Sequence, residues 1–357
     1  LYDYIGEANS ILNGFTITGG RGRQSSGGFD FQGGGIHIES GFNPTISNCF
    51  IRNNIGSGNT AGAGIYINGS SPTITKCIIE NNDAMNGQGG GIYIEGGSGN
   101  PIISRTIIRN NKAGFEGGGI FSNNQFELIN SYVINNDCQK GSEIFTSQRP
   151  YIIHSTLYKS TGTVQDGYGM IYGNGPIIEI QNSIVWSSNG VPAWGHNGGS
   201  TTISKSIYSG DGGYPGGNLI SDPYFDINTL QVSNYSPAIG AGSASPTKSS
   251  VSYSLPSTDY FGNPRSNPSN TNPDAGAYES VLSSPLRKTS FLVSLDGSGD
   301  YSTIQSAIDA LATGDTIRIS AGTYLENIDL GSKSFALIGD DKSTTIIDGG
   351  RNTSTIK

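Results

Sequence analysis

The sequence of 357 residues is poor in charge, in basic residues and in long apolar runs. Charged residues make up 13% of the chain, about half of the usual ~25%. Lys and Arg together number 20 and the formal net charge is −8, so the chain has no basic surface with which to follow a nucleic-acid backbone. No run of about 18 apolar residues is present, which excludes an ordinary transmembrane helix. The opening Leu-Tyr-Asp-Tyr-Ile also lacks the features of a signal peptide.

Cysteine and histidine are equally scarce. Cys49, Cys77 and Cys138 are an odd number, so at least one thiol is unpaired and a complete disulfide framework is excluded. The three histidines lie in unrelated contexts without the spacing of metal ligands. We therefore expect no metal, no cofactor and a fold that is stabilised by packing.

Glycine, in contrast, is abundant, with 54 residues, about twice the usual ~7%. The segment Gly-Gly-Gly-Ile and its variants recur at steps of 24 to 29 residues, and such a period is typical of a repeat architecture. The repeated isoleucines are Ile36, Ile65, Ile92, Ile120, Ile144 and Ile171. Each repeat reads as strand, turn, strand, turn, because short apolar runs are bounded by Gly, Pro and Asn.

An asparagine pair closes one apolar run in each of four repeats. Strands joined by links too short for crossover helices stack in parallel only if the chain winds as a solenoid. Equivalent side chains then lie about 4.8 Å apart, and stacked asparagines can bond from coil to coil. We predict an all-β, right-handed parallel β-helix with about 24–29 residues per central coil and a structural ladder of the first asparagines, Asn53, Asn81, Asn110 and Asn135.

Repeats such as Gly-Gly-Gly-Ile-Tyr-Ile followed by Pro-Thr-Ile-Thr-Lys-Cys-Ile-Ile-Glu-Asn-Asn resemble the parallel β-helix repeats of pectin-lyase-like surface proteins. The resemblance covers residues 9–185 and implies the fold, since related repeats occur in lyases, adhesins and anchored proteins. Ser-Pro-Ala-Ile at 236–239 and Asp-Ala-Gly-Ala-Tyr-Glu at 274–279 resemble the closing segment of β-helix proteins with a variable C-terminal surface anchor.

Four regions are predicted along the chain: central coils at 1–209, a closing segment rich in Gly, Pro, Ser and Asn at 210–280, a linker at 281–294, and a cap with first coils at 295–357. The segment Asp-Gly-Ser-Gly-Asp-Tyr-Ser-Thr-Ile-Gln-Ser-Ala-Ile-Asp-Ala, which begins at Asp296, resembles the opening of pectin methylesterases. An amphipathic capping helix is expected there, with Ser302 and Gln305 as its capping box. The catalytic motifs of that family do not accompany the resemblance, so we name no catalytic residues.

One column of aromatic rings follows the repeated isoleucines. If the isoleucines face inward, strand alternation turns the next residue outward, and this candidate strip for glycan or subunit contact comprises His37, Tyr66, Tyr93, Phe121, Phe145 and Tyr172 with the carboxylates Glu39 and Glu95. The rings could stack sugars or meet another subunit. Alternatively, residues 186–280 cover them, or they stack only to stabilise the sheet.

The two ends of the sequence read as two parts of one coil, because the last residues begin strands that the first residues continue. An open β-helix end exposes unpaired backbone groups, so we expect a junction formed by Leu1, Tyr2, Ile5, Thr355, Ile356 and Lys357. A unit of a tandem array, a subunit that donates its last segment to the next copy, and a circular permutant all remain open.

These observations predict a structural or adhesive unit of an extracellular or cell-surface assembly, polymerising head-to-tail with copies of itself across the Lys357/Leu1 junction and without a membrane span. The alternative is a secreted carbohydrate-active enzyme, lyase or esterase-like, or a glycan-binding β-helix that contacts cell-surface glycans. Acceptor triplets for N-glycosylation begin at Asn68, Asn234 and Asn352.

Overall fold

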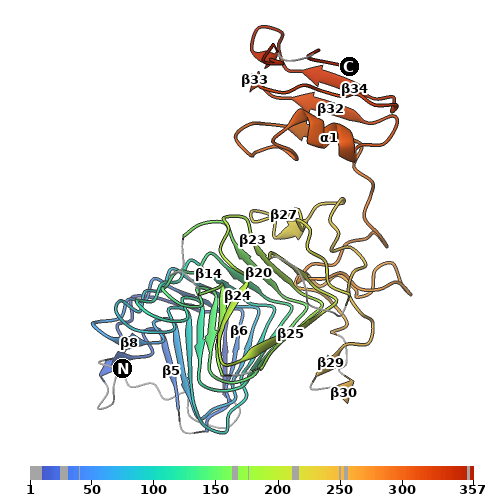
Figure 1. The fold of residues 1–357 in the computed structure, drawn as a ribbon. Helices are drawn as coiled ribbons and strands as arrows, with labels where there is room; N and C mark the ends of the chain where they lie inside the picture. Colours follow the sequence, from blue (N-terminus) through green and yellow to red (C-terminus); the bar gives the residue numbers. More distant parts are fainter. Residues whose placement is uncertain are drawn as a thin grey trace. The chain divides into compact units, whose positions relative to one another are not determined.

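A computed structural model describes residues 10–24, 31–39, 41–162, 168–175, 177–210, 217–248, 251–252, 256–351 and 354–357. The chain divides into two compact units, Leu1–Pro285 and Leu286–Lys357. Figure 1 shows the coils of the first unit in blue to yellow and the second unit in orange to red. Each unit has its own hydrophobic core.

The first unit is built from three long parallel sheets, each of which takes one strand from each of seven or eight successive coils. The first sheet contains β1 (Ile11–Asn13), β6 (Thr45–Ser47), β10 (Thr73–Thr75), β13 (Ile102–Ser104), β16 (Phe126–Ile129), β19 (Pro150–Ile153), β22 (Ile177–Gln181) and β25 (Ser200–Ser204). The second contains β2 (Thr16–Ile17), β7 (Phe50–Arg52), β11 (Ile78–Glu80), β14 (Ile107–Arg109), β17 (Tyr132–Ile134), β20 (Thr156–Lys159), β23 (Ile184–Ser187) and β26 (Ile207–Tyr208). The third contains β5 (Ile36–Ile38), β9 (Ile65–Asn68), β12 (Ile92–Glu95), β15 (Ile120–Ser122), β18 (Ile144–Thr146), β21 (Ile171–Asn174) and β24 (Trp194–Asn197). The predicted right-handed parallel β-helix is thereby confirmed.

The strand register follows the repeat that the sequence shows. Ile36 pairs with Ile65, Ile65 with Ile92, and the column continues through Ile120, Ile144 and Ile171. These side chains are at most 6% exposed and belong to the central core. Because a strand alternates its side chains between two faces, burying this column fixes which residues point outward.

The asparagine ladder lies one residue later than predicted. The first asparagine of each pair adopts a left-handed conformation, with φ of 55° at Asn53 and 53° at Asn110, and forms the turn, which asparagine tolerates better than most residues. The second asparagine points inward and is at most 1% exposed. The buried ladder therefore consists of Asn54, Asn82, Asn111 and Asn136, and the predicted ladder of Asn53, Asn81, Asn110 and Asn135 is wrong.

Each rung of the ladder joins two coils. Nδ2 of Asn82 donates to Oδ1 of Asn111 at 2.9 Å, and Nδ2 of Asn111 donates to Oδ1 of Asn136 at 3.0 Å. The same amides also donate to main-chain carbonyls of an earlier strand, for example from Asn111 to Ile79 at 2.9 Å. Every ladder amide thus satisfies groups on neighbouring coils inside the protein, where an unpaired polar group would be costly.

The closing segment packs against the coils of the same unit. Its described strands form small antiparallel pairs, namely β27 (Phe225–Asp226) with β28 (Gln231–Val232) and β29 (Thr247–Lys248) with β30 (Val251–Ser252). The Tyr132 hydroxyl donates to the carbonyl of Leu230 at 2.6 Å, and the amide of Gly276 donates to the carbonyl of Asn182 at 2.8 Å.

A further small sheet in the first coils joins β3 (Arg23–Gln24), β4 (Phe31–Gln32) and β8 (Thr60–Ala61).

In its described residues, the second unit contains the expected helix and five short strands. One sheet orders β31 (Ser290–Val293), β32 (Thr316–Ile319) and β34 (Ala336–Gly339), and another pairs β33 (Gly322–Tyr324) with β35 (Thr345–Ile347). The segment predicted as a linker therefore includes a strand, because Phe291 and Val293 pack into this core. Helix α1 spans Ile304–Ala310 and is capped by Thr303, not Ser302, through a bond from the Ser306 amide to the Thr303 side chain.

Candidate functional site

The aromatic strip occurs in the order that the sequence predicts. The six rings lie on β5, β9, β12, β15, β18 and β21, outside the isoleucine core. Neighbouring ring centroids are 4.6–5.6 Å apart: His37–Tyr66 4.8 Å, Tyr66–Tyr93 5.6 Å, Tyr93–Phe121 4.6 Å, Phe121–Phe145 5.1 Å and Phe145–Tyr172 5.6 Å. These separations are typical of stabilising aromatic pairs.

The strip exposes little of its ring surface. Its tyrosine and phenylalanine residues are at most 9% exposed, and the Tyr66 hydroxyl is bonded to Glu95. At one end, Glu39 accepts bonds from both His37 and Arg23 at 3.0 Å. The rings therefore stabilise the sheet by stacking. A glycan or subunit contact at this strip stays a prediction.

The residues expected at the chain junction divide into two groups. Leu1, Tyr2 and Ile5 lie outside the described residues. At the other end, Ile356 forms a parallel bridge with Ile328, and the amide of Lys357 donates to the Ile328 carbonyl at 3.0 Å. Residues 355–357 therefore extend the second unit's own strand pairing.

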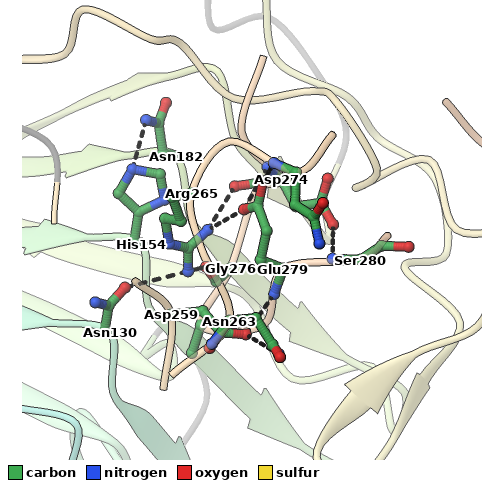
Figure 2. Close-up of polar contacts among 12 residues, drawn as sticks. Asn130, His154, Asn182, Asp259, Asn263, Arg265, Asp274, Gly276, Glu279 and Ser280 are labelled. Atoms are coloured by element: carbon green, nitrogen blue, oxygen red, sulfur yellow. Dashed lines mark hydrogen bonds and ion pairs between the residues drawn. The ribbon is translucent and has the colours of Figure 1, made fainter. Parts of the chain in front are cut away.

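A cluster of buried charges lies where the closing segment meets the coils (Figure 2). The side chain of Arg265 is fully buried and donates to Oε2 of Glu279 at 2.7 Å, to the Gly276 carbonyl at 2.8 Å and to Oδ1 of Asn130 at 3.1 Å. Asn130 belongs to a β-helix turn, whereas Gly276 and Glu279 belong to the closing segment. The guanidinium thus joins the two.

Three carboxylates surround this arginine, and backbone amides hold each of them. Glu279 accepts from the amides of Asn267 and Asp274 at 3.0 Å, and Asp274 accepts from Gly240 at 2.8 Å and Ser280 at 2.6 Å. Asp259 accepts from Asn263 and Glu279 at 2.8 Å. Carboxylates with several amide donors fix the path of a loop that has little regular secondary structure.

Burial perturbs the ionisation of this cluster. Desolvation, followed by the charge of Glu279, raises the pKa of Asp274 to about 7. Desolvation likewise raises the pKa of Glu279, lowers the pKa of Arg265 and holds the pKa of His154 well below its usual value. The His154 ring contacts Nδ2 of Asn182 at 2.9 Å.

An arginine beside acidic groups with raised pKa values has the composition of many active sites. Here, however, Asp259, Asp274 and Glu279 are at most 1% exposed and the side chain of Arg265 is 0% exposed, so a polymeric substrate cannot reach these groups. The cluster therefore holds the closing segment on the β-helix. In the sequence, Asp274 and Glu279 stand out only as members of one motif, and nothing indicates Arg265, because its partner Asn130 is 135 residues away.

The raised pKa of Asp274 predicts a specific pH dependence. Between about pH 4 and about pH 7 the folded protein binds a proton that the unfolded chain does not bind, so the contribution of Asp274 to stability falls as the pH rises. Asp274→Asn removes this proton. We expect the stability of the variant relative to the original protein to increase by up to about 1.4 kcal/mol per pH unit in this window, as measured by urea unfolding.

Asp226→Asn is the matched control. Asp226 is exposed, and bonds from Asn228 and Thr229 lower its pKa, so its contribution to stability is lost as the pH falls. Asp226→Asn should therefore show no pH trend in the window in which Asp274→Asn changes. Its own trend should appear only at lower pH and with the opposite sign. A constant difference between Asp274→Asn and the original protein would mean that Asp274 is already ionised at low pH.

Comparison with known families identifies two regions of the chain. Residues 4–157 match the model of the right-handed beta helix region, and residues 290–357 match the model of the pectinesterase family. The fold is thus the right-handed parallel β-helix of pectin-lyase-like proteins, with a second unit that is similar to part of pectinesterases. No solved structure matches significantly.

The similar curated proteins are plant pectinesterases. The chain is 42% identical over 67 residues to pectinesterase 1 of Citrus sinensis, a match that covers 17% of the chain and 12% of that protein. It is 37% identical over 78 residues to pectinesterase 3 of the same plant, covering 20% and 13%, and 40% identical over 67 residues to a pectinesterase of Daucus carota, covering 17% and 21%. The chain thus spans about a fifth or less of these relatives.

These similarities overturn the prediction of a structural or adhesive unit that polymerises head-to-tail. That prediction was based on the unfinished coil at the chain ends and on the missing catalytic motifs. Residues 290–357 match the pectinesterase family model, and the similar curated proteins are pectinesterases, so the carbohydrate-active alternative agrees better with the findings. Among the described residues, no helix is long and apolar enough to cross a membrane.

Proposed function

We propose that this protein acts outside the cell on pectin-type polysaccharides and hydrolyses their esters. The observation that carries the proposal is the match of residues 290–357 to the pectinesterase family model, together with 37–42% identity over 67–78 residues to the Citrus sinensis and Daucus carota proteins. In the proposed reaction, water cleaves a carboxylate ester of the polymer and releases an alcohol and a free carboxylate.

Two features of the chain support a polysaccharide substrate. The seven or eight strands of each sheet stack at about 4.8 Å per coil, which gives the β-helix long faces along which a polymer can lie. Low hydrophobicity and the scarcity of basic residues agree with a neutral polar polymer better than with a polyanion.

The net charge of −8 also predicts which form of the polymer binds. A fully esterified chain is neutral, whereas each hydrolysed ester adds one negative charge that the protein repels. Substrate is therefore held in preference to product. Added salt should reduce this preference, because it screens charges over distances beyond about 10 Å at 0.1 M ionic strength.

The test is to incubate the protein with a highly methyl-esterified galacturonan and to measure released methanol and new carboxylates. We expect equal amounts of both, and none from the same polymer after complete chemical de-esterification. Unsaturated products without methanol would indicate a lyase instead. If neither methanol nor carboxylate appears above a heat-denatured sample, esterase activity is refuted for this chain.

A further inference from the structure

The last glycine of each Gly-rich repeat lies over an amide of the asparagine ladder. A Cβ atom at Gly64 would lie 3.1 Å from Nδ2 of Asn82, and one at Gly119 would lie 3.0 Å from Nδ2 of Asn136. A larger side chain at these positions would therefore crowd the ladder. Glycine and asparagine depend on each other in these coils.

In one coil, a charged residue takes the place of this glycine. Since Ile144 pairs with Ile120, Glu143 occupies the position that Gly119 occupies in the preceding coil. Its carboxylate takes the place of the next ladder amide: Oε2 accepts from Nδ2 of Asn136 at 2.6 Å, and Oε1 accepts from the Asn136 main-chain amide at 3.2 Å. The ladder thus ends on an acidic group inside the protein.

A lysine reaches the same point from the next coil. Nζ of Lys159 lies 2.6 Å from the main-chain oxygen of Asn136 and 3.8 Å from Oε1 of Glu143. Asn136, Glu143 and Lys159 are each 0% exposed. A buried ion pair at 3.8 Å compensates poorly for the loss of water around both charges. Electrostatic attraction alone therefore does not explain why Lys159 and Glu143 are buried together.

The amine of Lys159 contacts the main chain of Asn136, the carboxamide of Asn136 contacts Glu143, and all three residues are buried. An amine, a carboxamide and a carboxyl group are the reactants of amide transfer. We propose that Lys159 and Asn136 react in the folded protein and form an intramolecular amide bond that links two neighbouring coils. In the reaction, neutral Nζ attacks Cγ of Asn136, the Nζ–Cγ bond forms, the Cγ–Nδ2 bond breaks and ammonia leaves. No oxidant or cofactor is required, and lysine amines are established nucleophiles when buried.

Glu143 is the residue that moves the proton. It takes one proton from the lysine ammonium before the attack and passes it to Nδ2 of Asn136, with which its Oε2 is already in contact at 2.6 Å. It then accepts the second proton that Nζ loses as the amide forms, so that ammonia leaves neutral and Glu143 ends protonated. Desolvation raises the pKa of Glu143 to about 7, which suits a group that must both accept and donate near neutral pH. Fixing the groups by the fold replaces the encounter that the reaction would need in solution.

The experiment is mass spectrometry of the intact protein, followed by peptide mapping. We expect a mass lower than the sequence mass by one ammonia, and a branched peptide in which the Lys159 side chain is joined to residue 136. A cyclic imide at Asn136 would also lose ammonia, but it leaves the two peptides separate. The branched peptide is therefore the decisive result.

Three variants test the assignment. Glu143→Gln retains the shape of the side chain but cannot transfer the proton, so it should fold, keep the full sequence mass and give no branched peptide. Asn136→Asp offers a carboxyl group in place of the carboxamide, so it should lose water and not ammonia; a loss of ammonia with a branched peptide in this variant would assign the bond to another residue. Lys140→Gln changes a partly exposed lysine that pairs with Glu116 at 3.6 Å, and it should keep the loss of ammonia.

Two results would overturn the proposal. A full sequence mass in the original protein, with separate peptides containing Asn136 and Lys159, would show that the three groups are a structural plug at the end of the ladder. A branched peptide formed with loss of water from the original protein would assign the bond to a carboxyl group, such as Glu143 or Asp137, and not to Asn136.

Discussion

Arg265→Met is expected to lower the free energy of unfolding by about 3–5 kcal/mol, the usual cost of removing one partner of a buried ion pair. The variant loses the bonds to Glu279, Gly276 and Asn130. It also leaves Glu279 and its acidic neighbours Asp259 and Asp274 in a buried site without their cation. Urea unfolding followed by circular dichroism measures the loss.

Arg52→Met is the control for this prediction. Arg52 is 43% exposed at its side chain and lies 3.9 Å from Glu80, so removing this surface pair should cost less than about 1 kcal/mol. The double variant Arg265→Met/Glu279→Gln should recover part of the stability, because the buried charge is removed together with its partner. Equal, small losses for Arg265→Met and Arg52→Met would show that the cluster does not hold the closing segment.

The sequence predicts the coils well because their information is periodic. Ile36, Ile65 and Ile92 recur with the same alternation, and the structure pairs them in register. Each coil of a solenoid has the same local structure as its neighbours, so the pattern of one coil indicates the strand register of the others. The order of the aromatic rings follows from the same periodicity and is equally predictable.

Within a repeat, single positions are harder to predict. Asn110 and Asn111 are identical residues, and which of them faces inward depends on the left-handed φ of 53° at Asn110. The apolar periodicity does not report a turn conformation, which is why the ladder was predicted one residue too early. Gly91 lies so close to Asn111 that a Cβ atom added to it would be 3.1 Å from Nδ2 of Asn111. This proximity becomes visible only in three dimensions.

The charged cluster around Arg265 is the feature that is hardest to predict from the sequence. Its contacts span 135 residues to Asn130 and 14 residues to Glu279, and its charged members lie in the closing segment, which has no period and little regular secondary structure. Buried polar networks are specified by exact geometry and not by a pattern of residue types. A single sequence therefore shows the motif at 274–279 but not that Arg265 connects this motif to Asn130.

Asn111→Ala is expected to destabilise the protein by about 3–5 kcal/mol, because four groups lose a partner at about 1–3 kcal/mol each and relaxation recovers part of the cost. The amide and Nδ2 of Asn82 lose Oδ1 of Asn111 as acceptor. The Ile79 carbonyl and Oδ1 of Asn136 lose its Nδ2 as donor. Urea unfolding provides the free energy, and amide hydrogen exchange at residue 82 provides a local measurement.

Asn110→Gly decides which asparagine of the pair is structural. Asn110 is exposed and has a positive φ that glycine adopts without strain, so this variant should change stability by less than about 0.5 kcal/mol. The two substitutions affect adjacent residues and both remove an amide side chain. A large loss of stability for Asn110→Gly with a small loss for Asn111→Ala would mean that the first asparagine of each pair forms the ladder. The opposite result would show that inward-facing amides, together with the isoleucine core, hold neighbouring coils in register.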